Sequence, residues 1–405
     1  MFLKKLKGKH LLILILLIAA SLRLYRLDFP NTYVFDEVYH AFTAKEYLQG
    51  HKEAWEWWTT PPPGVAYEWT HPPLAKEIMA ASMFVLKTDS PWAYRLPGVI
   101  LGIFSIFLVY LLGKKLFNNT TPSLIAAFIF SLDGLNFVQS RTGMNDIYFI
   151  TFILLSLLLF LQKKYFFSAL ILGLAMASKW TAVYIYLLFL PLLLFRLQPF
   201  QILCFIFIPP LVYLCTYLPF FLQGHDFNQF IELHKQMWWY HTNLKATHTY
   251  SSPWWSWPLN LYPVWYFVDY QNEKIGNIFA SGNPVVFWVG FTTIFLTAWE
   301  SFKKRSLNLL IIVLGFLVFW LPWAFSPRIM FLYHFAPSVP FLSLALGYQL
   351  NEGLKENRSK KLVILLIMLI ILNFILLYPF LTAIHLPKNF NEYFFSINLS
   401  KNPFN

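Results

Sequence analysis

The sequence predicts an all-α integral membrane protein in which about eleven helices span the bilayer. Of its 405 residues, 58% are hydrophobic and 12% are charged, about half the charged fraction of a typical soluble domain. So much apolar surface must face lipid, because a folded core cannot enclose it. Several of the eleven apolar runs reach the roughly 18 residues that a crossing needs. The runs are 10–27, 93–113, 121–139, 146–162, 165–178, 180–195, 199–222, 283–301, 307–325, 329–349 and 362–384.

Basic residues gather in the turns between these runs and predict how the chain is oriented. If the basic N-terminus is cytoplasmic, eleven crossings place every basic turn on the cytoplasmic side, where such residues are enriched. These turns explain the net charge of +12 without a nucleic acid partner. The first run follows several lysines, as in a signal peptide, but lacks a small-residue cleavage site, so we expect a retained span. The basic turns are Lys114-Lys115, Lys163-Lys164, Arg196, Lys303–Arg305 and Lys355–Lys361.

Two polar segments, 28–92 and 223–282, are too long to be simple connections, and both fall on the outer side in this topology. They are rich in Trp, Pro and His, and loops of this length are usually functional. We expect them to contain short helices that lie in the membrane interface. Their aromatic rings suit that interface or a sugar-stacking surface, and composition leaves both uses open.

Three histidines recur every seven residues in the second loop, at His234, His241 and His248. On one helix, successive members of this series would lie about 10 Å apart, which is too far to bind a single ion. We therefore expect no metal site there. The two cysteines, Cys204 and Cys215, lie in one apolar run without metal-binding spacing and are expected to be packing residues.

The residues able to do chemistry lie in the outer loops or at the outer ends of predicted helices. Asp36-Glu37 follow the first span, where they suit a catalytic base with a binding group or an ordinary helix start. His71 and Lys76 flank a helix start at Pro72-Pro73, which suits an anion site or a plain turn. Charge close to hydrocarbon is costly, so the remaining charged groups indicate a bound anion, such as phosphate, or buried ion pairs. These groups are Arg95, Arg141, Asp146, Lys179, Arg328 and His334.

Seven short sequence stretches indicate the kind of protein more specifically than these single residues do. They are FDE at 35–37, HPPLAK at 71–76, YRLPG at 94–98, SRTGMNDIY at 140–148, GLAMASKWT at 173–181, YHTNLKATHTYSSPWWSWPL at 240–259 and FLYHFAP at 331–337. Together, and in this order, they resemble the protein O-mannosyltransferases, the dolichyl-phosphate-mannose-protein mannosyltransferases of the C-type glycosyltransferase fold. The resemblance covers about residues 35–340.

The resemblance implies an inverting transferase that moves mannose from a polyprenyl-phosphate donor to Ser or Thr hydroxyls of translocated proteins. It implies that Asp36 is the base for the acceptor hydroxyl and that Glu37 positions acceptor or donor. The other site residues that it implies are His71 and Lys76 beside the two acids, Lys179, Arg328 and His334 at the lipid phosphate, and His241 and His248 in a loop over the donor. Arg95, Arg141, Asp146 and Tyr333 match family stretches and complete the expected substrate-binding set.

The chain departs from the eukaryotic members, because its second outer loop of about 60 residues has no room for their lectin-like domain. It resembles a compact prokaryotic relative. We therefore expect one membrane domain over residues 1–405, in a bacterial or archaeal plasma membrane, with the active site on the outer face. The donor lipid is open between dolichol and undecaprenol or another polyprenol. No cofactor is implied, and the need for a divalent metal and the oligomeric state are left open.

Two alternative functions differ in the class of protein. A related transferase would move another polyprenyl-phosphate sugar onto lipid A or a wall polymer, although HPPLAK and YHTNLKATHTY favour a protein acceptor. A flippase or transporter of lipid-linked sugars would place polar groups near the bilayer midplane, often within internal repeats. Here the charges lie at the outer helix ends and no repeat is evident, which favours an enzyme.

Overall fold

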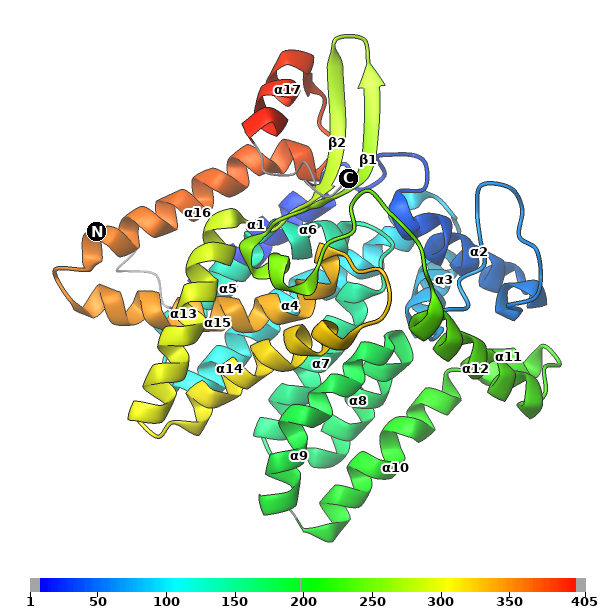
Figure 1. Ribbon diagram of the computed structural model, residues 1–405, viewed down its shortest axis with the longest axis horizontal. Coiled ribbons are helices and arrows are strands. Elements are labelled where there is room, and N and C mark those ends of the chain that lie inside the picture. Colours follow the sequence, from blue (N-terminus) through cyan, green and yellow to red (C-terminus); the bar gives the residue numbers. More distant parts are fainter. Residues whose placement is uncertain (1–7, 197, 398–405) are drawn as a thin grey trace.

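The computed structural model describes residues 8–196 and 198–397, and most of these residues are helical (Figure 1). Each of the eleven predicted apolar runs contains a helix, which confirms the predicted fold class. The helices in those runs are α1 (Gly8–Leu24), α4 (Pro91–Phe117), α5 (Thr120–Ser131), α6 (Gly134–Arg141), α7 (Asp146–Leu161), α8 (Tyr165–Ser178), η4 (Trp180–Tyr184), α9 (Ile185–Arg196), α10 (Pro199–Cys215), α11 (Leu218–Leu222), α13 (Pro284–Lys303), α14 (Leu307–Trp320), η6 (Leu321–Phe325), η7 (Leu332–Ser338), α15 (Val339–Lys355) and α16 (Lys360–Leu381).

The number of crossings stays a prediction. Among the described helices, four are long and apolar enough to cross a membrane: α4, α13, α14 continued by η6, and α16. The pair α5–α6, which bends by 62°, would be a fifth. The apolar helices α7, α8 and α10 are shorter, with 16, 14 and 17 residues, and reach less far at about 1.5 Å per residue.

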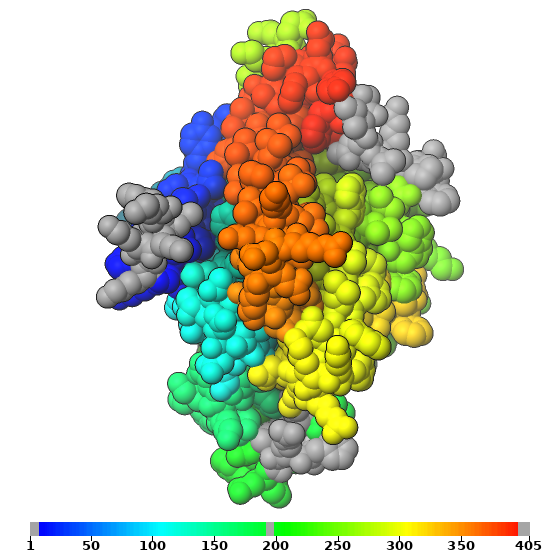
Figure 2. All heavy atoms as spheres, turned by 90° about the vertical axis from the view of Figure 1, so that its left-hand side faces the viewer, coloured from blue at the N-terminus to red at the C-terminus, as the bar shows by residue number. Residues whose placement is uncertain are grey.

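Helix α16 exposes many of its apolar side chains. Along its length, Leu362, Met368 and Ile375 are 57%, 53% and 59% exposed. Figure 2 shows this helix in orange along one face of the molecule. A row of exposed aliphatic side chains is unfavourable in water and favourable in lipid, so this face of the helix is suited to the bilayer.

The hairpin of α7 and α8 separates a basic turn from two charged residues of the predicted site. Lys163-Lys164 form its turn, whereas Asp146 begins α7 and Lys179 follows α8 at the opposite end. The helices pack closely because Ser156 and Ser168 each donate a hydroxyl to the other's backbone carbonyl, at 2.9 and 2.8 Å. In Figure 1 the turns between α13 and α14 and between α15 and α16 lie along the left and lower-left edges, away from the strands.

The first outer loop folds into short helices beside the helix ends. It contains η2 (Phe35–Val38), α2 (His40–Gln49), η3 (Lys52–Trp55) and α3 (Leu74–Leu86). Helices α2 and α3 pack together through Ala41, Ala44 and Met79, which are all buried. This packing fixes the two ends of the segment between them, residues 50–73.

The second outer loop contains the expected amphipathic helix, α12 (Phe227–Asn243), followed by η5 (Trp254–Leu259). Asp226 caps the start of α12 by accepting a hydrogen bond from the backbone N–H of Gln229 at 2.8 Å. Phe230, Leu233 and Met237 are buried on one face, with the spacing of a helix that lies on a surface. Trp238 and Trp239 on the other side are 64% and 56% exposed, as expected of rings at a membrane interface.

The same loop also contains strands, which the all-helical prediction did not include. Strands β1 (Val264–Gln271) and β2 (Lys274–Ala280) form an antiparallel hairpin, and β3 (Leu386–Pro387) extends it after β2. The two-residue turn at Asn272-Glu273 has a φ of 52° at Asn272, which asparagine tolerates well. The valine and aromatic residues of β1 favour a strand. The final described helix, α17 (Lys388–Ile397), packs beside this hairpin (Figures 1 and 2).

Candidate active site

A cavity of about 570 Å³ lies between the two outer loops and the helix ends beneath them. Its wall combines segments that are distant in the sequence, near residues 36, 70, 146, 179, 245 and 330. Eight of the thirteen residues predicted for the site lie on this wall: Asp36, His71, Asp146, Lys179, His248, Arg328, Tyr333 and His334. The cavity is therefore the candidate active site.

Asp36 presents its carboxylate to the cavity on a strained turn. The preceding Phe35 has a φ of 49°, a left-handed conformation that a bulky residue adopts only when its surroundings hold it there. Its ring stacks on Tyr266 with 4.2 Å between ring centroids, which holds the turn. Among the described residues no donor is hydrogen-bonded to the Asp36 carboxylate. Burial, reinforced by the nearby charge of Glu68, raises the pKa of Asp36 to about 7, which suits a base at neutral pH.

Glu37 does not line the cavity, although its neighbour does. Its carboxylate accepts hydrogen bonds from Arg95 Nε at 2.8 Å and from Arg95 NH2 at 2.7 Å. The backbone N–H groups of Val34 and Gly143 donate to the same carboxylate, both at 2.8 Å. Arg95 also donates to three backbone carbonyls, those of Leu27, Pro30 and Thr32. The sequence suggested that Glu37 contacts a substrate, whereas the structure shows it anchoring the turn that carries Asp36.

Lys179 and Asp146 form a buried ion pair in the cavity wall. Lys179 Nζ donates to Asp146 Oδ1 at 2.8 Å, and the two side chains are 8% and 3% exposed. The ammonium also lies 5.9 Å from the ring centroid of Tyr333, a cation–π contact. The ion pair expected from the sequence is therefore present, and both of its side chains also line the cavity, whereas anion binding by Lys179 stays a prediction.

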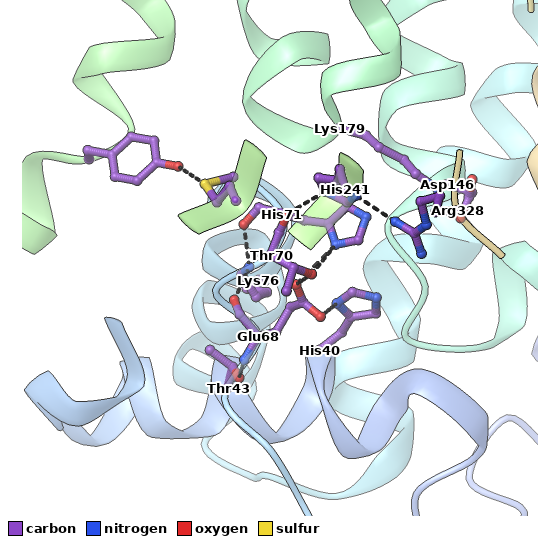
Figure 3. A network of polar contacts seen from close by, with 12 residues as sticks. His40, Thr43, Glu68, Thr70, His71, Lys76, Asp146, Lys179, His241 and Arg328 are labelled. Atoms are coloured by element: carbon purple, nitrogen blue, oxygen red, sulfur yellow. Dashed lines mark hydrogen bonds and ion pairs between the residues drawn. The ribbon is translucent and has the colours of Figure 1, made fainter. Parts of the chain in front are cut away.

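Arg328 lines the cavity and has no carboxylate partner among the described residues (Figure 3). Its NH1 group donates to His241 Nδ1 at 2.5 Å, and His241 Nε2 donates to the backbone carbonyl of Thr70 at 2.8 Å. A carbonyl only accepts, so the His241 proton must be on Nε2. Burial and the charge of Arg328 lower the pKa of His241 to about 4, which keeps the ring neutral. The buried Nε of Arg328 has no hydrogen-bond acceptor in the part of the chain that the structure describes, so the guanidinium is oriented but has an unused donor.

Glu68 joins the first outer loop to this network, and the sequence analysis did not identify it. One of its carboxylate oxygens accepts from the Thr70 hydroxyl at 2.5 Å and from His71 Nδ1 at 3.0 Å. The other lies 3.9 Å from His40 Nδ1. Burial lowers the pKa of His40 to about 4 and that of His71 well below its usual range, so both rings are neutral at pH 7. Figure 3 shows these side chains in one connected group beside Lys76.

Several predicted residues lie behind the cavity wall. Lys76 donates to the backbone carbonyls of Glu68 at 2.6 Å and His71 at 2.9 Å, and so supports the loop that carries them. Arg141 donates to the carbonyl of Tyr25 at 2.6 Å, away from the cavity. These two residues, together with Glu37, Arg95 and His241, are placed to orient the wall, whereas the sequence suggested direct contact with substrate.

The three regularly spaced histidines do not form one cluster. Helix α12 ends at Asn243, so His248 lies beyond it, at the cavity wall. His234 Nε2 contacts the hydroxyl of Tyr213 at 2.8 Å, away from His241. Within residues 8–196 and 198–397, no three His, Cys, Asp or Glu side chains are grouped as a metal ion would require. The expectation that no cofactor is needed stays a prediction.

The arrangement of the helices is the C-type glycosyltransferase fold, as comparison with solved structures shows. The structure of the Saccharomyces cerevisiae protein O-mannosyltransferase complex bound to the sugar donor matches with a TM-score of 0.75 at 16% identity, covering 94% of this chain and 91% of that one. The structure of ArnT from Cupriavidus metallidurans matches with a TM-score of 0.59 at 13% identity, covering 84% of this chain and 59% of that one.

Sequence comparison defines the family within this fold. The family described as dolichyl-phosphate-mannose-protein mannosyltransferase matches residues 13–223, and the C-terminal four-transmembrane region of protein O-mannosyltransferase matches residues 226–395. The chain belongs to this family. The polyprenol-phosphate-mannose–protein mannosyltransferase of Mycobacterium tuberculosis is 25% identical, over 92% of this chain and 88% of the relative. The Saccharomyces cerevisiae dolichyl-phosphate-mannose–protein mannosyltransferase 1 is 34% identical over 31% of this chain and 17% of the relative.

Proposed function

We propose that the protein transfers mannose from a polyprenyl-phosphate donor to Ser or Thr hydroxyls of polypeptides, with inversion of the anomeric carbon. The observation that carries the proposal is the arrangement of charge in one cavity, where the Asp36 carboxylate shares the wall with the cations Arg328 and Lys179. The names of the mycobacterial relatives support the donor and the class of acceptor.

The reaction needs one base and an anion-binding group. The acceptor hydroxyl oxygen attacks the anomeric carbon and forms the new glycosidic bond, while its proton passes to the Asp36 carboxylate. The bond from the anomeric carbon to the phosphate oxygen breaks on the opposite face, so the configuration inverts. The polyprenyl phosphate leaves as an anion, which requires neutralisation of charge rather than a proton donor.

Arg328 is the principal group for the donor phosphate. Its guanidinium is held by neutral His241 and has no carboxylate to compete with the ligand among the described residues. Preorganised cations of this kind favour phosphate because the cost of orienting them is met before the ligand binds. Lys179 and His334 line the same cavity as Arg328 and complete the phosphate site.

We propose that the cavity opens on the outer face of a bacterial plasma membrane. Asp146 and Lys179 lie at one end of the α7–α8 hairpin, and Lys163-Lys164 lie at the other. Along α4, Arg95 likewise lies near the first turn and Lys114-Lys115 lie in the last turn. Basic turns are enriched on the cytoplasmic side, which supports an outward-facing cavity. The acceptor polypeptide would then reach the site from outside the cell.

The proposal is tested by replacing Asp36 in purified protein. Transfer of radiolabelled mannose from polyprenyl-phosphate-mannose to a Ser/Thr-rich peptide is expected for the wild type and is abolished by Asp36→Asn, which keeps the shape of the side chain but removes the base. Asp89→Asn is the matched control, because Asp89 lies in the same outer loop, paired with Lys45 and outside the cavity. Near-normal turnover by Asp36→Asn would remove Asp36 as the base. If a folded wild-type protein transfers no mannose to the peptide, the proposal that the acceptor is a protein is refuted.

A further inference from the structure

A second groove, of about 300 Å³, lies between the β1–β2 hairpin and α17. Aromatic rings form much of its wall, from Tyr250, Trp265, Tyr270 and Phe395. The hairpin projects from the helical body beside α17, so this groove is on the same side of the molecule as the outer loops (Figure 1). The catalytic mechanism proposed above uses none of these rings.

Trp265 is held in a fixed orientation at the base of the groove. Its Nε1 donates to Asn277 Oδ1 at 2.9 Å, and Asn277 Nδ2 donates to Asn391 Oδ1 at 2.7 Å. The rings of Trp265 and Phe395 pack with 4.4 Å between centroids. The groove is therefore organised before any ligand arrives, which reduces the entropy cost of binding.

A register shift in β1 directs neighbouring side chains to two places, the Asp36 turn and the groove. The pairing with β2 shifts register between Trp265 and Phe267. Tyr266 consequently turns into the protein, where its ring stacks on Phe35, the residue before Asp36. Beyond the shift, Val268 and Tyr270 share the groove wall and are 38% and 74% exposed. One strand thus contributes both to the support of the catalytic turn and to the groove.

The groove continues from the mouth of the catalytic cavity. His248 lines the cavity, and Tyr250 lines the groove. Their ring centroids are 5.5 Å apart, and those of Tyr250 and Trp265 are 6.1 Å apart. An extended chain, at about 3.3 Å per residue, covers these two steps in roughly three to four residues.

The backbone of β1 offers hydrogen bonds at the free edge of the sheet, next to the groove. In the sheet order β1–β2–β3, this strand is at the edge, and no described segment pairs with its outer side. Hydrogen-bonded and non-hydrogen-bonded pairs alternate from the turn at Asn272-Glu273, so the N–H and C=O groups of Val268 and Tyr270 face outward. An unpaired edge beside aromatic side chains is a known arrangement for binding an extended peptide.

We propose that this groove binds the extended acceptor polypeptide on one side of its target Ser or Thr. The inference rests on the proposed protein acceptor and specifies where that acceptor lies. The target hydroxyl enters the cavity at Asp36, and the chain passes His248 and Tyr250 to pair with the edge of β1. Backbone pairing and aromatic contact need little sequence specificity, so the groove would accept many polypeptides. A membrane lipid would not use the polar strand edge.

The test compares the KM values of acceptor peptides of two lengths. A Ser/Thr peptide of about three residues ends before the groove, whereas one of about ten residues reaches it. Tyr270→Ala is expected to raise the KM for the long peptide about fivefold and to leave the KM for the short peptide and for the donor unchanged. Tyr25→Ala is the matched control, because Tyr25 is an exposed tyrosine, at 52%, outside both cavities.

A second pair of variants tests the strand edge. Val268→Pro removes an outward N–H, a change that edge strands tolerate, and Val268→Ala shortens the side chain alone. The proline variant is expected to raise the KM for the long peptide above that of the alanine variant. Equal KM values of these two variants for the long peptide would overturn the proposal that the acceptor backbone pairs with β1.

Three results with Tyr270→Ala would overturn the proposal that the groove binds the acceptor polypeptide. They are an unchanged KM for the long peptide, an equal change for both peptides, and a change only for peptides that already carry mannose, which would indicate a saccharide site. If the wild type uses the short peptide while any of these results holds, the groove proposal fails and the proposed function stands. A wild type that uses neither peptide would overturn both.

Discussion

Replacement of the buried acid next to the proposed base tests how the catalytic turn is held. We predict that Glu37→Gln destabilises the protein by about 3 to 5 kcal/mol, the usual cost of removing one partner of a buried ion pair. The side chains of Glu37 and Arg95 are 0% and 2% exposed, so water does not screen the charge that remains. Each carboxylate oxygen receives one Arg95 nitrogen and one backbone N–H. A glutamine NH2 group would therefore face two donors in either orientation.

Stability and activity should fall together in this variant, because the anchor of the Asp36 turn is lost. Unfolding in detergent micelles, followed by helical circular dichroism, measures stability, and mannose transfer measures activity. Glu232→Gln is the control, since its pair with Lys235 is exposed and such pairs contribute about 1 kcal/mol or less. A Glu37→Gln protein that unfolds like the wild type but loses transfer would refute this reasoning and return Glu37 to substrate positioning.

Two further predictions concern the reacting groups. The value of kcat/KM should rise with pH, reach half its maximum near the Asp36 pKa of about 7 and level off above about pH 8, because Asp36 accepts a proton only when it is ionised. A flat profile from about pH 5 to 8 would contradict its role as the base. Arg328→Ala should raise the apparent donor KM about tenfold and leave the acceptor KM unchanged, because it removes a charge-assisted contact to phosphate. Separate titration of donor and acceptor measures both constants, and an unchanged donor KM would take Arg328 out of the phosphate site.

The cavity was largely predictable where the sequence stretches carry unusual charge. Asp36, Lys179 and Arg328 stand out because ionisable groups at helix ends in a membrane protein are costly and rarely accidental. Glu68 was missed, although it directly precedes the WTHPP stretch at 69–73 and is an acid in an otherwise aromatic segment. His40 was missed because a lone histidine near an amphipathic helix is not distinctive without its partner.

The hairpin was missed for a different reason. Residues 264–271 read VWYFVDYQ, which is rich in β-branched and aromatic residues, and the two-residue turn follows at once. In a chain where 20% of the residues are aromatic, this local signal does not differ from the interfacial segments around it. Its role beside the catalytic turn depends on the contact between Tyr266 and Phe35, which are far apart in the sequence.

Hydrophobic length and charge are local properties, so the amino-acid sequence alone indicates a helical membrane protein with its candidate site residues in two long polar loops and at helix ends. It does not indicate which of the two adjacent carboxylates faces the cavity. That choice depends on the left-handed backbone of Phe35 and on distant partners of Glu37, namely Arg95 and the backbone of Gly143. Only the tertiary structure brings these groups together. It buries one acid in an ion pair and leaves the other open to the cavity.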